Sequence, residues 1–173
     1  MKKYQLILAD PPWSYQNWTD KKSGAAKAHY SQLKLKDLCA LPVQNISEND
    51  SVLLMWATFP KLDEAMEVIN AWGFKYITAP FVWNKTYKDG KPYCGLGFWS
   101  RSGSELILMG KKGKGLPRQS KSVRQVITSP VERPHSTKPK ETYDRILELF
   151  GDVSRIELFA RNKETGWMLL KRD

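Results

Sequence analysis

A carboxylate, two prolines and an indole stand together near the start of the chain, as Asp10, Pro11, Pro12 and Trp13. They follow a short apolar segment, residues 4–9, which has the composition of a buried strand. Open α/β sheets bind their ligands at the carboxyl ends of strands. The position therefore predicts a ligand site, although Asp-Pro-Pro alone also suits a turn and tryptophan also suits a core.

These residue types suit the binding of a planar aromatic amine. The Asp10 carboxylate accepts a hydrogen bond from an exocyclic NH2, and the carbonyls around Pro11 and Pro12 add acceptors without a competing proline N–H. The indole of Trp13 can stack on the ring. An amine held only by acceptors keeps its nitrogen lone pair directed at an electrophile, which is the arrangement that group transfer to this nitrogen needs.

Composition places the chain among cytoplasmic globular proteins. Its 173 residues form one expected domain, 1–173, and 41% of them are hydrophobic. The two cysteines, Cys39 and Cys94, lack metal-ligand spacing and, with no signal peptide recognisable, indicate a reducing compartment. No apolar run approaches the about 20 residues of a membrane helix. The net charge of +10 favours a polyanionic partner, nucleic acid before membrane.

Part of this charge is concentrated in a stretch without acidic residues, between Leu106 and Val131. The basic residues in it are Lys111, Lys112, Lys114, Arg118, Lys121 and Arg124. Neighbouring glycines predict a flexible loop. Such a loop is suited to contact a nucleic-acid backbone, while a solvated surface loop or a subunit interface has the same composition.

Hydrophobic patterning predicts an α/β domain. Strands are expected at residues 4–9, 51–57, 76–83, 105–109, 123–128, 155–160 and 166–170, and helices at 35–41, 61–72 and 139–150. Residues 18–27 are expected to form a mobile loop. Strands that alternate with helices imply a mostly parallel sheet with helices on both faces.

Further motifs occur in order along almost the whole chain. They are His29-Tyr30, Leu54-Met55-Trp56, Trp72-Gly73-Phe74, Trp83-Asn84-Lys85, Gly97-Phe98-Trp99 with Arg101 and Glu105, His135 to Pro139, Glu157 to Arg161, and Gly166-Trp167. With residues 10–13, this set resembles the N6-adenine methyltransferases of the family typified by the catalytic subunit of the eukaryotic messenger-RNA m6A writer.

The resemblance implies a Rossmann-like fold with a permuted motif order, S-adenosylmethionine as methyl donor, and transfer to the exocyclic N6 amine of adenine. Bacterial and phage members of the family are short, like this chain, which favours DNA as the substrate. Two alternatives stay open: an RNA adenosine methyltransferase, or a non-catalytic nucleic-acid-binding partner subunit of such an enzyme.

Five residues are expected to bind the cofactor. Lys138 opens a helix and can pair with the cofactor carboxylate, a role that the resemblance also implies. Asp10 lies at the same edge. In the strand at 155–160, strict alternation places Glu157, Phe159 and Arg161 on one side, and the resemblance implies that Arg161 contacts the ribose or carboxylate.

The expected substrate contacts are less sharply defined, and most of them have a structural alternative. They are Tyr15, Tyr30, Trp56, Trp83, Lys85, Arg101, Glu105 and His135. The two tryptophans end strands, so they either wall the pocket or pack in the core. Arg101 is either oriented toward substrate by Glu105 or paired with it within the sheet. Tyr15 and His135 either touch the base or hold their loops.

Two family features are not found in the sequence. The Gly-Asn-Glu or Gly-Asn-Gln segment that usually follows Gly-Trp does not follow Trp167, and there is no Gly-x-Gly-x-x-Gly. The cofactor ribose is therefore expected to be bound differently, or with help from a second subunit in a homodimer or a complex with a partner.

Overall fold

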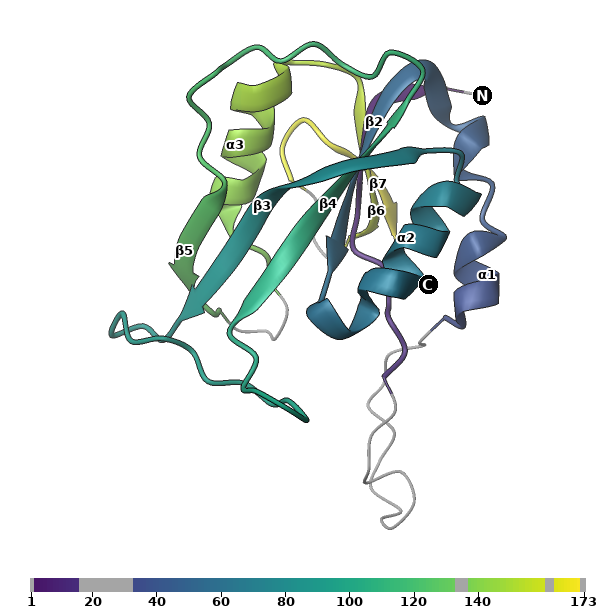
Figure 1. The fold of residues 1–173 in the computed structure, drawn as a ribbon. Coiled ribbons are helices and arrows are strands. Elements are labelled where there is room, and N and C mark those ends of the chain that lie inside the picture. Colours follow the sequence, from purple (N-terminus) through teal and green to yellow (C-terminus); the bar gives the residue numbers. More distant parts are fainter. Residues whose placement is uncertain (1, 16–32, 133–136, 161–163, 172–173) are drawn as a thin grey trace.

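The computed structural model describes residues 2–15, 33–132, 137–160 and 164–171, and residues 169–171 by their backbone alone. Within these ranges, seven strands form one sheet in the spatial order β5-β3-β4-β2-β1-β6-β7 (Figure 1). The strands are β1 (Tyr4–Ala9), β2 (Ser47–Ala57), β3 (Lys75–Thr86), β4 (Ser104–Lys112), β5 (Val126–Pro130), β6 (Arg155–Ala160) and β7 (Met168–Lys171).

The expected mostly parallel sheet is confirmed. Strand β1 runs parallel to both β2 and β6, β6 runs parallel to β7, and β3 runs parallel to β5. Only β4 among these strands is antiparallel to its neighbours, β2 and β3. Because β4 is reversed, its first residues lie at the edge where β1 and β2 end, and Leu106 pairs with Ala57 there.

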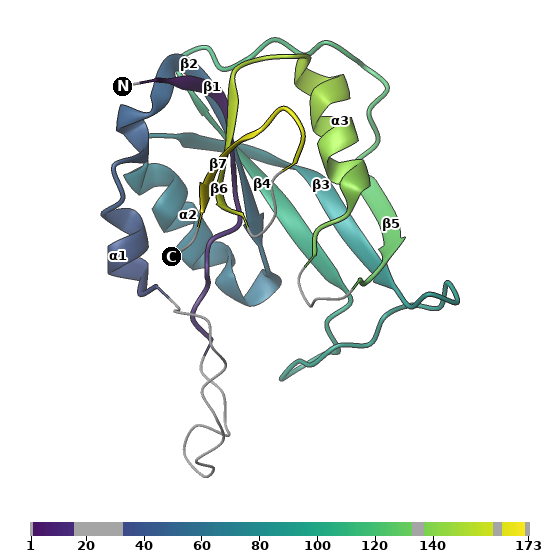
Figure 2. The ribbon, with the colours of Figure 1, turned by 180° about the vertical axis from the view of Figure 1, so that it is seen from behind.

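Helices cover both faces of the sheet, as expected for a Rossmann-like α/β fold. Helices α1 (Leu35–Cys39) and α2 (Leu62–Ala71) lie on one face, and α3 (Lys140–Phe150) lies on the other, which is clearest from behind (Figure 2). Two 3₁₀ turns, η2 (Val43–Asn45) and η3 (Phe59–Lys61), precede β2 and α2. None of the described helices is long and apolar enough to cross a bilayer.

The continuous apolar runs of β1 and β2 follow from this double cover. On β1, Ile7 packs toward α1 and α2, and its neighbours Leu6 and Leu8 pack toward α3. Strand residues alternate between faces, so a strand covered on both sides must be apolar at every position. At the end of α2, the Trp72 indole donates a hydrogen bond of 2.8 Å to the Leu38 carbonyl of α1.

Several element boundaries differ from the sequence expectation. Strand β2 begins at Ser47, four residues before the expected start, although residues 47–50 are polar. Its first residue pairs with Tyr4 of β1, so strand pairing extends β2 beyond its apolar run. The expected helix at 61–72 is divided between η3, which contains Pro60, and α2.

Candidate active site

The Asp-Pro-Pro-Trp segment leaves the sheet directly after β1. The backbone N–H of Asp10 donates to the Leu158 carbonyl of β6 at 3.3 Å, and the N–H of Trp13 donates to the Pro11 carbonyl at 2.8 Å. The Trp13 indole donates to the Trp56 carbonyl at 3.0 Å, and only 7% of Trp13 is exposed. The segment is therefore fixed to the ends of both neighbouring strands, and the Asp10 side chain keeps an exposed fraction of 26%.

A chain of alternating charges extends from Asp10. The Lys138 ammonium, just before α3, lies 3.4 Å from Asp10 Oδ1 and 2.6 Å from Glu105 Oε2. Glu105, at the start of β4, also binds the Lys85 ammonium at 2.5 Å. The three side chains beyond Asp10 are each between 10% and 15% exposed. We refer to Asp10, Lys138, Glu105 and Lys85 as the charge network.

The members of the charge network hold one another in their charged forms. Burial alone would lower the pKa of Lys138, but the carboxylates of Asp10 and Glu105 outweigh it and raise that pKa above its ordinary value. Burial alone would raise the pKa of Glu105, but Lys138 and Lys85 outweigh it and lower that pKa. A buried ammonium and carboxylate are thus both ionised at neutral pH.

Two tryptophans lie beneath the cations of the network. The Lys138 ammonium is 4.6 Å from the centre of the Trp56 ring, and the Lys85 ammonium is 4.8 Å from the centre of the Trp83 ring. The two indoles meet edge to face at 6.3 Å, and both are at most 2% exposed. Trp56 and Trp83 therefore pack in the core and support Lys138 and Lys85 by cation–π contact.

A second carboxylate lies beside Asp10 on β6. Glu157 is 3% exposed and accepts a hydrogen bond of 2.9 Å from the Tyr143 hydroxyl of α3. Its other oxygen, Oε2, has no hydrogen-bond partner among the described residues. Burial, followed by the negative charge of Asp10 and Glu164, raises the pKa of Glu157 to about 7.

The strict alternation expected for residues 157–161 does not hold at Phe159. Its φ of 64° is the one positive value among described residues other than glycine, and the register of β6 with β7 shifts between Leu158 and Ala160. The resulting bulge turns Phe159 toward the core cluster that contains Leu158, away from the face of Glu157. Left-handed backbone at a non-glycine residue is strained, and such strain concentrates at functional sites.

Tyr15 lies close to the network and braces its own segment. Its hydroxyl is 2.5 Å from the Thr58 hydroxyl, and the Lys61 ammonium is 5.5 Å from its ring centre. Burial raises the pKa of Tyr15, and Glu105 and Asp10 add to that rise. The contact with Thr58 braces the segment, and 37% of Tyr15 stays exposed at this edge.

Comparison with known proteins agrees with this geometry. The MT-A70 family model matches residues 4–172. The chain belongs to the MT-A70 family. The Type II methyltransferase M.MunI of Mycoplasma sp is 37% identical, and the alignment covers 96% of this chain and 76% of that protein. An N(6)-adenosine-methyltransferase MT-A70-like protein of Arabidopsis thaliana is 24% identical over 96% of this chain and 23% of its own length.

A mouse relative in the family, the N(6)-adenine-specific methyltransferase METTL4, is 25% identical over 96% of this chain and 36% of its own length. The chain thus spans three quarters of the mycoplasmal relative, but less than a quarter of the Arabidopsis protein and little more than a third of the mouse protein. The resemblance to N6-adenine methyltransferases inferred from the motifs is confirmed at the level of the family.

One of the two alternatives for Arg101, an ion pair with Glu105 within the sheet, is wrong. Glu105 binds Lys85 and Lys138 instead, and Arg101 is exposed in the β3–β4 connection. The spacing of residues along β3 indicates where Lys85 lies, although the residue type alone is only weak evidence for a site. Trp83 and Lys85 are two residues apart on β3 and share a face, and Trp83 pairs directly with Glu105.

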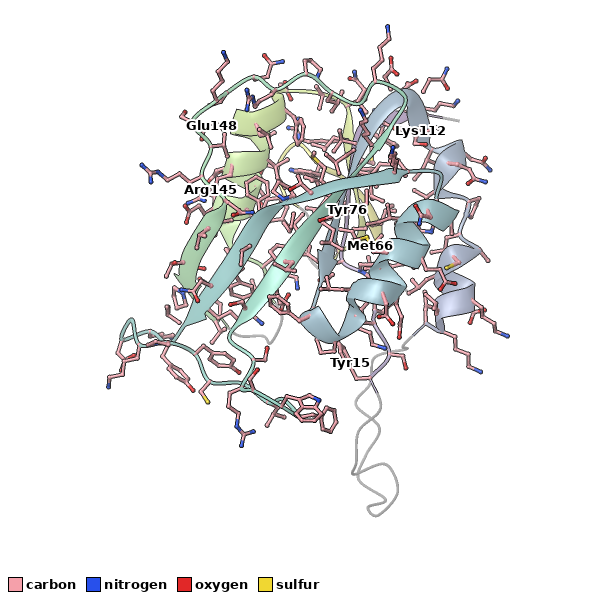
Figure 3. All side chains as sticks on the ribbon, in the orientation of Figure 1. Tyr15, Met66, Tyr76, Lys112, Arg145 and Glu148 are labelled. Carbon is pink, nitrogen blue, oxygen red and sulfur yellow. The ribbon has the colours of Figure 1, made fainter. Side chains whose placement is uncertain are left out.

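The basic stretch does not join the site. Lys111 and Lys112 belong to β4 rather than to a loop, and they pair with Val52 and Ser51 in the middle of β2, at the end of β4 that lies away from Glu105. This is the edge opposite Asp10, and Figure 3 shows Lys112 and Tyr15 at opposite ends of the molecule. The Lys112 ammonium donates to the Ser47 hydroxyl at 2.9 Å. The remaining four, Lys114, Arg118, Lys121 and Arg124, are exposed in the segment between β4 and β5.

Three expected site residues, Tyr30, His135 and Arg161, lie outside the described residues. Asp10, Lys138, Glu105 and Lys85 come together in one network, and Glu157 lies next to it, so the described part of the site is assembled from β1, β3, β4, β6 and the start of α3.

Proposed function

We propose that this MT-A70 protein transfers a methyl group from S-adenosylmethionine to the exocyclic N6 amine of adenine in DNA. The observation that carries the proposal is the charge network, which holds the Asp10 carboxylate at the carboxyl edge of the parallel strands with a buried cation behind it. Family membership supports methyl transfer, since the relatives compared above are named as methyltransferases.

The residues present fit the proposed cofactor, which carries a carboxylate, an ammonium group and ribose hydroxyls. The buried Oε2 of Glu157 lacks a partner among the described residues, and a ligand hydroxyl or ammonium would satisfy it. An ammonium has three N–H donors, so Lys138 can hold a carboxylate in addition to Glu105 and Asp10. When bound, the cofactor supplies an electrophilic methyl group on a sulfonium.

In the proposed mechanism Asp10 orients the adenine amine. Its carboxylate accepts an N–H of the amine, and the Pro11 carbonyl, which already accepts the Trp13 N–H, has a second lone pair for the same group. Held by acceptors, the nitrogen presents its lone pair to the methyl group, and no proton need leave before the new N–C bond forms. Catalysis then comes mainly from orientation and preorganised charge.

Trp13 is proposed to anchor this arrangement. Its indole is buried and bound to the Trp56 carbonyl, so stacking on the adenine would require the segment to move. Lys138 balances the charge of Asp10, and Glu105 holds Lys138 in place. A target base in a duplex must leave its stack to reach Asp10, at a cost of a few kcal/mol that is smaller in a single strand.

DNA is proposed as the polymer because the chain spans most of the short mycoplasmal methyltransferase. RNA is the second candidate, since one relative, from Pyricularia oryzae, is named as an N6-methyladenosine RNA methyltransferase and is 26% identical over 95% of this chain. A net charge of +10 suits either polymer.

The decisive experiment is a tritiated-methyl transfer assay with analysis of the digested nucleosides. Genomic DNA unmethylated at adenine, its heat-denatured form and total RNA are offered to the wild type, Asp10→Ala and Asp10→Asn. The exposed Asp144→Asn on α3 is the matched control. We expect N6-methyldeoxyadenosine from the wild type and the control only. Methylation by Asp10→Ala at the wild-type rate would refute the mechanism, and product in RNA alone would reassign the substrate.

A further inference from the structure

The connection between β3 and β4 carries exposed apolar side chains that the proposed function does not use. The exposed fractions of Leu96, Phe98 and Trp99 are 88%, 74% and 102%. We call residues 96–99 the aromatic tip. Clustered apolar groups of this size on a soluble protein mark interaction sites, because leaving them in water is unfavourable.

The aromatic tip stands on an ordered stem. The centres of the Tyr87 and Tyr93 rings are 5.2 Å apart, and the Gly95 N–H donates to the Ser102 carbonyl at 2.7 Å. A Cβ added at Gly97 would lie 2.0 Å from a carbonyl oxygen of the same turn, so the turn requires glycine. The stem and this tight turn present Phe98 and Trp99 to solvent rather than letting them fold back onto the sheet.

The tip projects from the edge that carries Asp10. Strand β4 begins at Ser104, so the stem is joined directly to Glu105 of the charge network, and the backbone N–H of Lys85 binds the Gly103 carbonyl at 2.9 Å. Figure 1 shows the β3–β4 connection extending beyond the edge at which β1 and β2 end. A substrate held at Asp10 therefore lies on the same side of the molecule as the tip.

The charges around the aromatic tip indicate which kind of partner it binds. Three cations, Lys88, Lys91 and Arg101, accompany a single anion, Asp89, between residues 87 and 103. A second copy of this chain would bring the same excess and a net charge of +10 toward the tip, whereas a polyanion is attracted. Exposed aromatic rings among cations are the usual means of holding unpaired bases and their phosphates.

We propose that the aromatic tip stacks on unpaired bases beside the target adenine and holds the nucleic acid open while that adenine occupies the Asp10 site. This inference rests on the proposed function for the identity of the polymer. Stacking depends on ring faces that every base has, so the tip adds affinity for opened strands without selecting a sequence.

The test is equilibrium binding of fluorescein-labelled, adenine-containing oligonucleotides, single-stranded DNA, duplex DNA and RNA, over a range of salt concentrations. The variants are Phe98→Ala/Trp99→Ala, Trp99→Phe and Arg101→Ala. Tyr76→Ala, on β3 at the edge opposite Asp10 and 37% exposed, is the matched aromatic control. Thermal unfolding and a calorimetric titration with S-adenosylmethionine verify that each variant is folded.

We expect the double variant to lose about 10- to 100-fold in single-strand affinity, the range for loss of base stacking. The slope of log affinity against log salt should stay unchanged, because no phosphate contact is removed, while Arg101→Ala should lower that slope by about one. Trp99→Phe should keep most of the affinity, and Tyr76→Ala should bind like the wild type.

Unchanged affinity in the double variant would overturn the proposal. So would a wild-type dimer that the double variant converts to a monomer in sedimentation, which would assign the tip to self-association. The binding readout does not require methyl transfer. If the wild type methylates no polymer yet the double variant still loses affinity, the proposed function fails and the stacking role stands.

Discussion

Replacing Glu105 by glutamine tests the charge network most directly. The carboxylate binds Lys85 at 2.5 Å and Lys138 at 2.6 Å, and glutamine has the same shape without the charge. Its amide NH2 would also face one of the two ammonium groups as a donor against a donor. Lys138 would keep Asp10 as a counter-ion at 3.4 Å, while Lys85 would lose its carboxylate.

The expected loss of stability follows from the burial of these groups. Breaking a buried ion pair by removing one partner costs about 3–5 kcal/mol, because the remaining charge stays buried without compensation. The side chains here keep 10–15% exposure and Lys138 keeps Asp10, so we expect about 2–4 kcal/mol for Glu105→Gln, within and slightly below that range. Adding Lys85→Met should recover about 1–2 kcal/mol, since it removes the stranded cation.

Urea unfolding of the two single variants and the double variant measures these differences, with methyl transfer followed at a temperature at which all are folded. The pKa of Glu105 is lowered in the native state, so its contribution is present above the ordinary value of 4.5 and is lost as the pH falls through the native pKa. The gap between wild type and Glu105→Gln should therefore be full near neutral pH and close in acid.

The exposed pair of Lys91 and Asp89 supplies the control, and Asp89→Asn should leave the unfolding midpoint unchanged. A cost below about 0.5 kcal/mol for Glu105→Gln, comparable with surface substitutions, would refute the reasoning, because it would mean that the cations do not depend on this carboxylate. Equal costs at acid and neutral pH would also contradict it, since the loss would then not be electrostatic.

Three further predictions concern Glu157, Phe159 and the basic segment between β4 and β5. Burial raises the pKa of Glu157 to about 7, so the native state favours the neutral form of this carboxyl group. The protein should therefore lose stability as the pH rises from 4.5 to about 7, by about 3 kcal/mol at most. The Glu157→Gln variant should not show this loss when unfolding is measured on either side of that pH range. The same variant should bind S-adenosylmethionine more weakly by calorimetry, and tighter binding would contradict the role given to Oε2. Because the φ of Phe159 is 64°, the Phe159→Gly variant should be more stable than Phe159→Ala by about 1 kcal/mol in thermal unfolding, which is the reverse of the usual order. If the alanine variant were the more stable of the two, the strained bulge would be excluded. Replacing Lys114, Arg118 and Lys121 by alanine should leave kcat at saturating nucleic acid unchanged, because this segment begins at the edge of the sheet opposite Asp10. A phosphate contact in the segment would change only the affinity for nucleic acid and the salt dependence of that affinity. A fall in kcat would place the segment in the site.

Much of the fold was accessible from local pattern. The bounds of β1 and β6 agree with the expected strands, and α2 lies within the expected helix at 61–72. These elements have strong periodicity and clear ends, such as Gly73, which takes a φ of 81° after α2. The polar start of β2 was not accessible in this way, because pairing with β1 decides it.

The sequence by itself determined the family and the identity of the Asp10 segment, because a set of residue types in a fixed order can be recognised without knowing any distance in the fold. Only the tertiary structure decided which charged side chains of the site contact one another. Lys138 and Glu105 are 33 positions apart in the chain, yet their charged atoms meet at 2.6 Å because β4 runs antiparallel to its neighbours and returns its first residues to the edge of β1. The same reversal carries Lys112 to the far edge, away from the site. Strand direction is a property of the whole sheet, so contacts that depend on it cannot be read from spacing along the chain.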